Sequence, residues 1–358
     1  MAVSILSRRD GSRRDMAPLS AYARPGAVAG SDRLVPMTCE PTHPSVYLPG
    51  ADPRLIVADM DGTLLDGEGR IPEELWGLLD VMRERGIVFV PASGRQYFTL
   101  EGMFERASSG MPFICENGTF VVRDGEEMSS CSLPRADVVR TVELLRGLRE
   151  RDLGIVIAGK KCGYFDRTEP DFRVEVDKYY RRSAYLEDIL DYDDDVNKIA
   201  IYDFGDAEQG TFRDLQGALE GVSVVVSAKH WIDVMRVEAN KGNAVKSLQA
   251  ELGITRDQTV AFGDYFNDLE MLEASGMSFA MADAHPGIIE ASRYVAPSHT
   301  EHGVIAVLKN LLGLKKVHQA TARRSPRHSL PESRRARAWH RKCGVPPRTD
   351  APIPWRPC

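Results

Sequence analysis

The chain has 358 residues, of which 43% are hydrophobic and 27% are charged, and its formal net charge is −6. This length allows two domains and a sizeable core. No apolar run approaches the ~20 residues of a membrane-spanning helix. The six cysteines and eight histidines show no metal-ligand spacing, which argues against a zinc site, and a chain this long does not need disulfides.

The two ends of the chain differ from the rest. Residues 1–53 are rich in Pro, Gly, Ser and Arg, and residues 314–358 carry 12 Lys and Arg against 2 Asp and Glu. Neither end has apolar periodicity, so we predict a disordered N-terminal extension and a disordered basic tail. The tail could hold nucleic acid weakly, but the acidic remainder argues against such binding by the folded part. No apolar stretch follows Arg8-Arg9, which disfavours export and predicts a cytoplasmic protein.

The first elements follow a β–α–β order. Residues 55–58 are an apolar run that predicts a strand buried on both faces. Residues 72–85 predict a helix that begins at Pro72 and stops at Gly86, and residues 87–92 predict the next strand. Such a unit has a right-handed crossover and favours a parallel sheet. We therefore predict the first half of an α/β core domain at residues 54–126.

After Asn117 the pattern changes to an α+β segment. It predicts a hairpin at 119–125, a helix through Val138, Val142 and Leu145, and a further helix near 212–219. Strands are predicted at 154–158, 197–203, 222–227 and 231–235. The α/β pattern resumes with a helix that begins at Lys241. We thus predict an inserted α+β cap at 127–236, placed to act as a lid, and a second core half at 237–313.

Polar residues follow the predicted core strands. Asp59 and Asp61 come directly after the first strand, and Ser93 follows the second. Asp264 and Asp268 follow the apolar residues 258–263. Ligands of parallel sheets bind beyond the carboxyl ends of the strands, and acids there are costly without a cation or reacting group. If the strands are neighbours, these side chains converge with Lys241 into a cluster that suits Mg²⁺ and a phosphoryl group.

Four motifs in order carry a family resemblance. They are Asp59 to Leu65, Ala92-Ser93-Gly94-Arg95, Lys241-Gly242-Asn243-Ala244, and Gly263-Asp264 with Asn267-Asp268. Over about residues 54–312 the chain resembles the haloacid dehalogenase superfamily of phosphohydrolases, in its Cof-like IIB branch. Glu116-Asn117-Gly118 agrees as a secondary signature, whereas Asp283 stands where the family often has asparagine. The resemblance implies a doubly wound, mainly parallel Rossmann-like core sheet with an inserted α+β cap.

The resemblance also implies roles for the motif residues. Asp59 would be the nucleophile and form an aspartyl-phosphate, and Asp61 would be the general acid and base. Mg²⁺ would be held by the Asp59 carboxylate, the Asp61 backbone carbonyl and Asp264. Phosphate-binding residues would be Gly62, Ser93, Gly94, Lys241 and Asn267, with Asn267 alternatively a metal contact. Asp268 would orient Lys241 or a metal-bound water.

Plainer interpretations exist for single residues. Ser93 alone could be a helix N-cap, Lys241 a surface lysine, and Asp268 an ordinary acid in the first turn of a helix. For the whole chain we favour a Mg²⁺-dependent phosphatase of a small phosphorylated metabolite, such as a sugar phosphate, a nucleotide or a cofactor precursor. A phosphomutase on the same fold and a non-catalytic ligand-binding protein are the alternatives. Specificity lies in cap residues that form no short motif, and the oligomeric state is left open.

Overall fold

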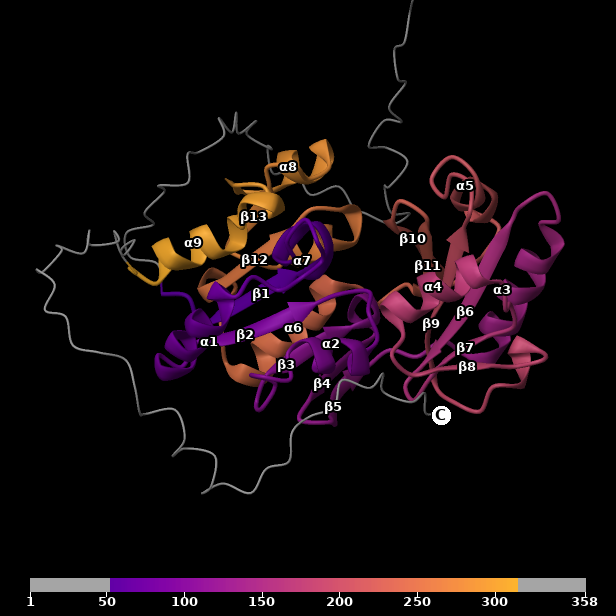
Figure 1. Ribbon diagram of the computed structural model, residues 1–358, viewed down its shortest axis with the longest axis horizontal. Coiled ribbons are helices and arrows are strands. Elements are labelled where there is room, and N and C mark those ends of the chain that lie inside the picture. The colour runs from indigo at the N-terminus through magenta and orange to yellow at the C-terminus, as the bar shows by residue number, and fades with distance from the viewer. Residues whose placement is uncertain (1–51, 315–358) are drawn as a thin grey trace, which may run out of the picture. The chain divides into compact units, whose positions relative to one another are not determined.

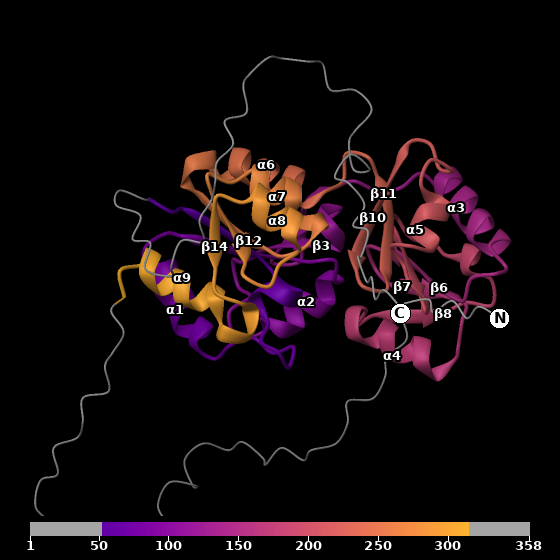
Figure 2. The same ribbon diagram turned by 90° about the horizontal axis from the view of Figure 1, so that it is seen from above.

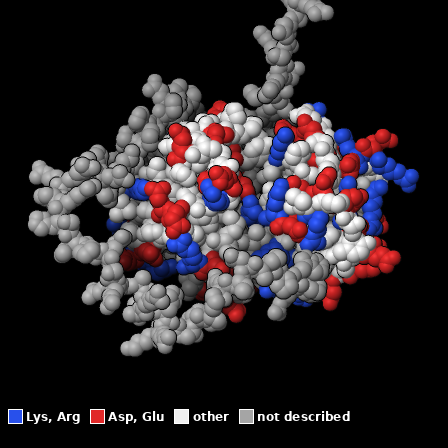
Figure 3. Space-filling view, viewed as in Figure 1, with Lys and Arg blue, Asp and Glu red and all other residues white. Residues whose placement is uncertain are grey.

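The computed structural model of the chain describes residues 52–314 (Figure 1). Our predictions for the N-terminal extension and for the basic tail concern residues that lie almost wholly outside this range. Among the described residues, no helix has both the length and the apolar character needed to cross a bilayer. Lys and Arg are interspersed with Asp and Glu on the face seen in Figure 3, a mixture typical of a surface that stays in water.

Eight strands form the larger sheet, in the order β14-β13-β12-β1-β2-β3-β4-β5. The six strands from β14 to β3 run parallel, and β4 and β5 add an antiparallel hairpin at one edge. From β1 the chain winds outward through β2 and β3 and later returns to the other side of β1 through β12, β13 and β14. The predicted doubly wound, mainly parallel core is therefore confirmed. The strands are β1 Leu55–Asp59, β2 Val88–Ala92, β3 Pro112–Cys115, β4 Phe120–Arg123, β5 Glu126–Ser130, β12 Thr259–Gly263, β13 Met277–Met281 and β14 Tyr294–Ala296.

Helices cover both faces of this sheet, with α6, α7 and α8 on one side and α1, α2 and α9 on the other (Figure 2). The apolar pattern explains α1: Leu75, Leu78, Leu79 and Met82 form its buried face. The helix stops before Gly86, which takes a positive φ of 66°. The bounds are α1 Glu74–Glu84, α2 Tyr97–Met103, α6 Lys241–Leu252, α7 Leu269–Glu273, α8 Pro286–Ala291 and α9 Gly303–Leu311.

A second, mixed sheet lies within the segment between β5 and α6, and we call it the cap sheet. Its strand order is β10-β11-β9-β6-β7-β8. β5 pairs with β4 in the core sheet, so the insert starts after Ser130 and not at residue 127 as we predicted. The elements are α3 Arg135–Gly147, β6 Leu153–Gly159, β7 Gly163–Phe165, α4 Pro170–Tyr179, β8 Ser183–Tyr185, β9 Val196–Asp203, α5 Thr211–Leu215, β10 Val222–Ala228 and β11 Trp231–Arg236.

One predicted cap helix is shorter than expected. The apolar pattern predicted a helix near 212–219, but α5 ends at Leu215. Gln216 has a ψ of 114°, outside the helical region, and Gly217 follows with a φ of 79°. Backbone geometry therefore ends the helix before the apolar pattern does, although Leu219 is still buried in the cap core.

The two faces of the cap sheet have different partners. Ile199, Ile201, Ile232 and Val234 pack with α3 and α5 in one apolar cluster. Ala200 and Trp231 belong to a separate cluster with residues of α4. Because side chains alternate along a strand, Lys198 and Asp233 lie on the same face as Ala200 and Trp231. We call this the α4 face, and it carries the charged residues of the two central strands.

Candidate active site

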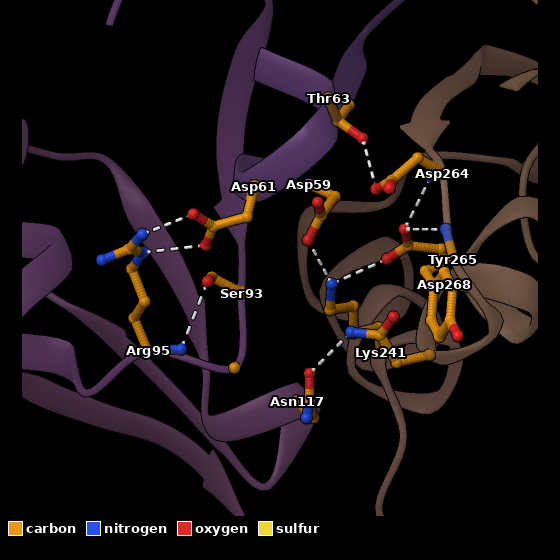
Figure 4. A network of polar contacts seen from close by, with 12 residues as sticks. Asp59, Asp61, Thr63, Ser93, Arg95, Asn117, Lys241, Asp264, Tyr265 and Asp268 are labelled. Carbon is orange, nitrogen blue, oxygen red and sulfur yellow. Dashed lines mark hydrogen bonds and ion pairs between the residues drawn. The ribbon is translucent and has the colours of Figure 1, made fainter. Parts of the chain in front are cut away.

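Neighbouring strands bring three carboxylates together beyond the sheet (Figure 4). Asp59 ends β1, Asp264 follows β12, and these two strands pair in parallel. With Asp268, they offer ligand oxygens that all lie within 4.8 Å of one another. Asp59 and Asp268 are buried, and Asp264 is partly buried. The sheet topology thus places these acids as the strand-end argument predicted.

Lys241 is the counter-charge of this acidic cluster. It is the first residue of α6, and its side chain has no exposed surface. Its Nζ donates to Asp59 Oδ1 at 2.5 Å and to Asp268 Oδ1 at 2.7 Å. Burial alone would lower the pKa of Lys241, but the Asp268 and Asp59 carboxylates outweigh it and raise the pKa. The interpretation of Lys241 as a surface lysine is therefore wrong.

The acidic cluster holds more negative charge than Lys241 neutralises. Burial raises the pKa of Asp59 well above its usual value, and Asp268 adds to the effect while Lys241 opposes it. Burial, again with Asp268, raises the pKa of Asp264 to about 7. Three carboxylates facing one ammonium are a set of hard oxygen donors with excess charge, which fits Mg²⁺.

Asp268 is fixed by contacts on both of its carboxylate oxygens. Oδ1 accepts from Lys241, and Oδ2 accepts from the backbone N–H of Asp264 at 3.0 Å and of Tyr265 at 3.4 Å. Asp268 also precedes the first turn of α7, where an acid is favourable. Asp268 is therefore both an acid at the start of a helix and a contact of Lys241. Through that contact it positions the Lys241 ammonium.

The side chain of Asp61 lies apart from the acidic cluster. Arg95 donates to both of its oxygens, from Nε at 3.0 Å and from Nη2 at 2.5 Å. The Asp61 side chain is 49% exposed. Arg95 Nη1 also donates to the Lys178 carbonyl of the insert, at 2.7 Å. The sequence motif included Arg95 but gave it no role.

Gly62 and Thr63, which follow Asp61 in the sequence, both lie against the side chain of Asp264. Gly62 has a φ of 77°, and a β-carbon there would lie 2.5 Å from Asp264 Oδ2. Glycine is therefore required both by the backbone conformation and by the space. Thr63 Oγ1 donates to Asp264 Oδ1 at 3.0 Å, a contact that the sequence motifs did not suggest.

Ser93 and Gly94 follow β2 at the same edge of the sheet. Ser93 is buried, and its Oγ accepts from the backbone N–H of Arg95 at 3.2 Å. The next helix, α2, begins only at Tyr97 with Gln96 as its N-cap, so the N-cap interpretation of Ser93 is wrong. The hydroxyl proton of Ser93 can therefore be directed to a ligand, because a hydroxyl that accepts one bond can still donate another.

A second charged group, which we call the Lys198 cluster, consists of Lys198, Glu116 and Asp233. Lys198 Nζ is 3.2 Å from Asp233 Oδ2, 3.2 Å from Glu116 Oε2 and 2.7 Å from the carbonyl oxygen of Gly94. All three side chains are buried. Lys198 and Asp233 are charged residues that are buried within the mainly apolar strands β9 and β11, which is the signal that the sequence analysis left unused.

Two asparagines connect the Lys198 cluster to the core. Asn117 Nδ2 donates to Asp233 Oδ2, and Asn267 Nδ2 donates to Asn117 Oδ1 at 3.0 Å. Glu116 and Asn117 both take a positive φ, of 48° and 58°. Two consecutive non-glycine residues in this region are strained, and such strain is concentrated at functional sites.

A cavity of about 230 Å³ opens between these groups. Core residues line one part of it and cap residues the other, so it joins the predicted catalytic residues to the α4 face of the cap sheet. Its core residues are Asp59, Asp61, Gly62, Ser93, Gly94, Asp264, Tyr265 and Asn267, and its cap residues include Tyr179, Tyr180, Lys198, Ala200, Trp231 and Asp233.

Comparison with known proteins gives consistent matches. A family model described as haloacid dehalogenase-like hydrolase matches residues 56–308. The 5-amino-6-(5-phospho-D-ribitylamino)uracil phosphatase YbjI of Escherichia coli is 30% identical over 262 residues, which cover 72% of this chain and 96% of that protein. The HMP-PP phosphatase of Escherichia fergusonii is 32% identical over 241 residues, covering 65% and 85%.

Solved structures show the same fold. A haloacid dehalogenase-like hydrolase from Bacteroides thetaiotaomicron is similar with a TM-score of 0.64 and 26% sequence identity. The similarity covers 72% of this chain and 99% of that one, so it includes both the core sheet and the insert.

Proposed function

The chain belongs to the haloacid dehalogenase-like hydrolases, and we propose that it is a Mg²⁺-dependent phosphatase that acts through an aspartyl-phosphate on Asp59. The observation that carries this proposal is the position of Asp59. It ends a buried strand, contacts Lys241, faces Asp264 and lines the cavity. A carboxylate held so firmly beside a cation is placed for attack on a phosphoryl group.

The first step uses Asp59 as the nucleophile. One of its oxygens attacks phosphorus, the bond from phosphorus to the ester oxygen breaks, and Asp61 protonates that leaving oxygen. Asp61 then takes a proton from the water that hydrolyses the acyl-phosphate, which releases inorganic phosphate and restores Asp59. Asp61 lines the same cavity, which supports this assignment.

Other residues stabilise the phosphoryl oxygens. Lys241 keeps its charge because two carboxylates contact it, and Ser93 can donate from its hydroxyl. Mg²⁺, held by Asp59, Asp264 and the backbone carbonyl of Asp61, would neutralise further charge on these oxygens. Both Asp268 oxygens are already engaged, so we assign this residue to positioning Lys241 rather than to the metal.

The substrate is proposed to be a small phosphorylated metabolite. The two named relatives are phosphatases of a ribitylaminouracil phosphate and of HMP-PP, and the cavity of about 230 Å³ is suited to a small molecule. Sugar phosphates, nucleotides and cofactor precursors remain the classes to test. The close approach of Asp59, Lys241 and Asp264 counts against a protein that only binds a ligand.

A phosphate-release screen of phosphorylated metabolites tests the proposal. We expect turnover with Mg²⁺, loss of turnover when EDTA removes the metal, and recovery when Mg²⁺ is added back. Asp59→Asn should abolish turnover while its circular dichroism stays that of the wild type. Asp80→Asn, an exposed aspartate of α1 paired with Arg83, is the matched control and should remain active.

Two results would contradict this proposal. A folded Asp59→Asn protein that retains near-wild-type turnover would remove Asp59 from the mechanism. Conversion of a hexose 1-phosphate into its 6-phosphate without phosphate release would identify a phosphomutase instead. Product analysis of the same reaction distinguishes these results.

A further inference from the structure

We propose that Asp233 and Trp231 recognise a hydroxyl group on the leaving group of the substrate, close to the phosphate ester. The inference rests on the proposed phosphatase function and deepens it, because it names the chemistry that the cap selects. The two residues would be specificity determinants, with no part in the transfer of the phosphoryl group itself.

The first support is their position on the α4 face. Trp231 and Asp233 are two residues apart on β11, so they point to the same side of the cap sheet. Both line the cavity together with Ala200, which is the register partner of Asp233 on β9. Ile232 between them points the other way, into the apolar cluster with α3 and α5. Trp231 and Asp233 therefore lie on the cavity side of the strand and not on the side of the apolar cluster with α3 and α5.

The second support is the lack of partners for two buried atoms. Trp231 is 6% exposed and Asp233 is 1% exposed. Within residues 52–314, neither Nε1 of Trp231 nor Oδ1 of Asp233 has a hydrogen-bond partner. Native proteins leave few such groups unpaired, because burial removes their hydrogen bonds to water without replacing them. One atom is a donor and the other an acceptor, and a hydroxyl group can satisfy both.

The charge of the Lys198 cluster limits what can bind beside Asp233. Its one ammonium faces two carboxylates, and Lys198 already contacts Gly94, Glu116 and Asp233. Lys198 is thus already paired with two carboxylates of the chain, and a second phosphate or a carboxylate of the substrate would have to compete with them. A neutral group that donates to Asp233 is favoured, and an anionic group there would be repelled.

Contacts with the core place this hydroxyl near the ester. Lys198 donates to the carbonyl of Gly94, the residue next to Ser93. Asn117 connects Asp233 to Asn267, one residue before Asp268. The Lys198 cluster thus contacts Gly94 directly and Asn267 through Asn117, and these two residues are the sequence neighbours of Ser93 and Asp268 at the phosphoryl end of the cavity. The recognised hydroxyl should therefore be on a carbon close to the ester oxygen.

Three phosphate monoesters of equal chain length test the proposal. They are 2-hydroxyethyl phosphate, 2-aminoethyl phosphate and n-propyl phosphate, which carry a hydroxyl, an ammonium and a methyl group at the same position. We expect the wild type to prefer the hydroxyl over the methyl compound by about 10- to 100-fold in kcat/KM, the effect of a hydrogen bond to a charged group. The ammonium compound should be poorer than the hydroxyl compound, because it has no acceptor for Trp231.

Two variants assign this preference to the two residues. Asp233→Asn keeps the shape of the side chain and leaves Lys198 paired with Glu116. Trp231→Phe keeps an aromatic ring and removes the indole N–H. Each should reduce the hydroxyl-to-methyl ratio of kcat/KM by about tenfold. The matched control is Asp203→Asn, because Asp203 is a buried cap aspartate whose carboxylate accepts from Thr211 and Gly205. The control should keep the wild-type ratio.

Each outcome decides the matter. A wild type that hydrolyses all three esters equally, or prefers the ammonium compound, would overturn the inference and leave the phosphatase proposal intact. An unchanged ratio in both variants would also overturn it. If Asp233→Asn does not fold, Trp231→Phe decides alone. A wild type that hydrolyses no phosphate ester would overturn the proposed function and this inference together.

Discussion

Glu116 should make the stability of the protein depend on pH. It is a glutamate that is 1% exposed, and burial raises its pKa from the usual 4.5 to about 7 although Lys198 opposes the change. The other charged groups that face it are Lys198 on β9 and Asp233 on β11. Glu116→Gln replaces the carboxyl group with a neutral amide of the same shape. Lys198 keeps Asp233 as its partner in the variant.

The direction of the effect follows from proton binding. Below pH 4.5, Glu116 is protonated in both the folded and the unfolded protein. Between pH 4.5 and about 7 the unfolded chain loses the proton first, so the free energy of unfolding falls as pH rises. Above about pH 7 both states are ionised, and the loss reaches ~3 kcal/mol. Glutamine does not titrate, so the variant escapes this loss.

Chemical denaturation of both proteins measures this difference. From about pH 5 to about pH 8, the free energy of unfolding of Glu116→Gln should rise relative to the wild type by about 2–3 kcal/mol. In thermal unfolding this corresponds to a relative increase in Tm of roughly 4–12 °C. Titrating groups that do not contact Glu116, including Asp59 and Asp264, are present in both proteins and cancel in the comparison.

Glu127→Gln is the matched control. Glu127 lies near the surface, where a hydrogen bond from Ser130 lowers its pKa, so its contribution has the opposite sign. The relative stability of this variant should not rise with pH. If Glu116→Gln and the wild type differ equally at both pH values, Glu116 is ionised throughout, and its contact with Lys198 outweighs its burial.

Three further predictions concern the site and its support. Asp61→Asn should lower kcat by ~10²–10⁴-fold and cause phosphorylated protein to accumulate. Mass spectrometry after acid quenching detects this species. A loss in kcat below about tenfold would mean that Asp61 is not the general acid and base. Lys241→Met leaves buried carboxylates without their counter-charge, so the free energy of unfolding in urea should fall by ~3–5 kcal/mol. A variant as stable as the wild type would contradict the role of Lys241 as counter-charge. Gly118→Ala should cost roughly 2 kcal/mol or more and reduce turnover, because φ is 92° and a β-carbon would overlap the carbonyl of Asn240. Gly125→Ala, with a φ of 79° and open space, is its control and should cost roughly 1 kcal/mol without affecting turnover.

Much of the core could be predicted from the sequence because its signals are local. The apolar run of β1 and the apolar face of α1 each specify one element. Once the strands are parallel, their ends meet at one edge, so the convergence of Asp59 and Asp264 follows from topology alone. The family resemblance added Lys241, which pattern alone would have left as a surface residue.

The insert and the core strand β5 before it were less predictable for physical reasons. β5 reads Glu-Glu-Met-Ser-Ser and has no apolar alternation, because only its pairing with β4 makes it a strand. β7 and β8 have three residues each, too few to show a period. The sequence also could not show which face of the cap sheet meets the cavity, since that depends on packing between distant segments. Lys198 and Asp233 were therefore left without a role, although charge in apolar strands is unusual.

The two buried clusters differ in the charge that they lack. When all three carboxylates around Lys241 are ionised, as metal ligands would be, its one positive charge leaves a deficit of two, which a divalent cation would correct. Lys198 gives one positive charge to two carboxylates. Because the pKa of Glu116 is about 7, that deficit is below one charge at neutral pH, and a neutral hydrogen-bond donor is enough. We therefore propose that charge favours the phosphoryl group and a metal ion at the Asp59 end of the cavity and a hydroxyl group at the Asp233 end, which would set the direction in which a substrate binds.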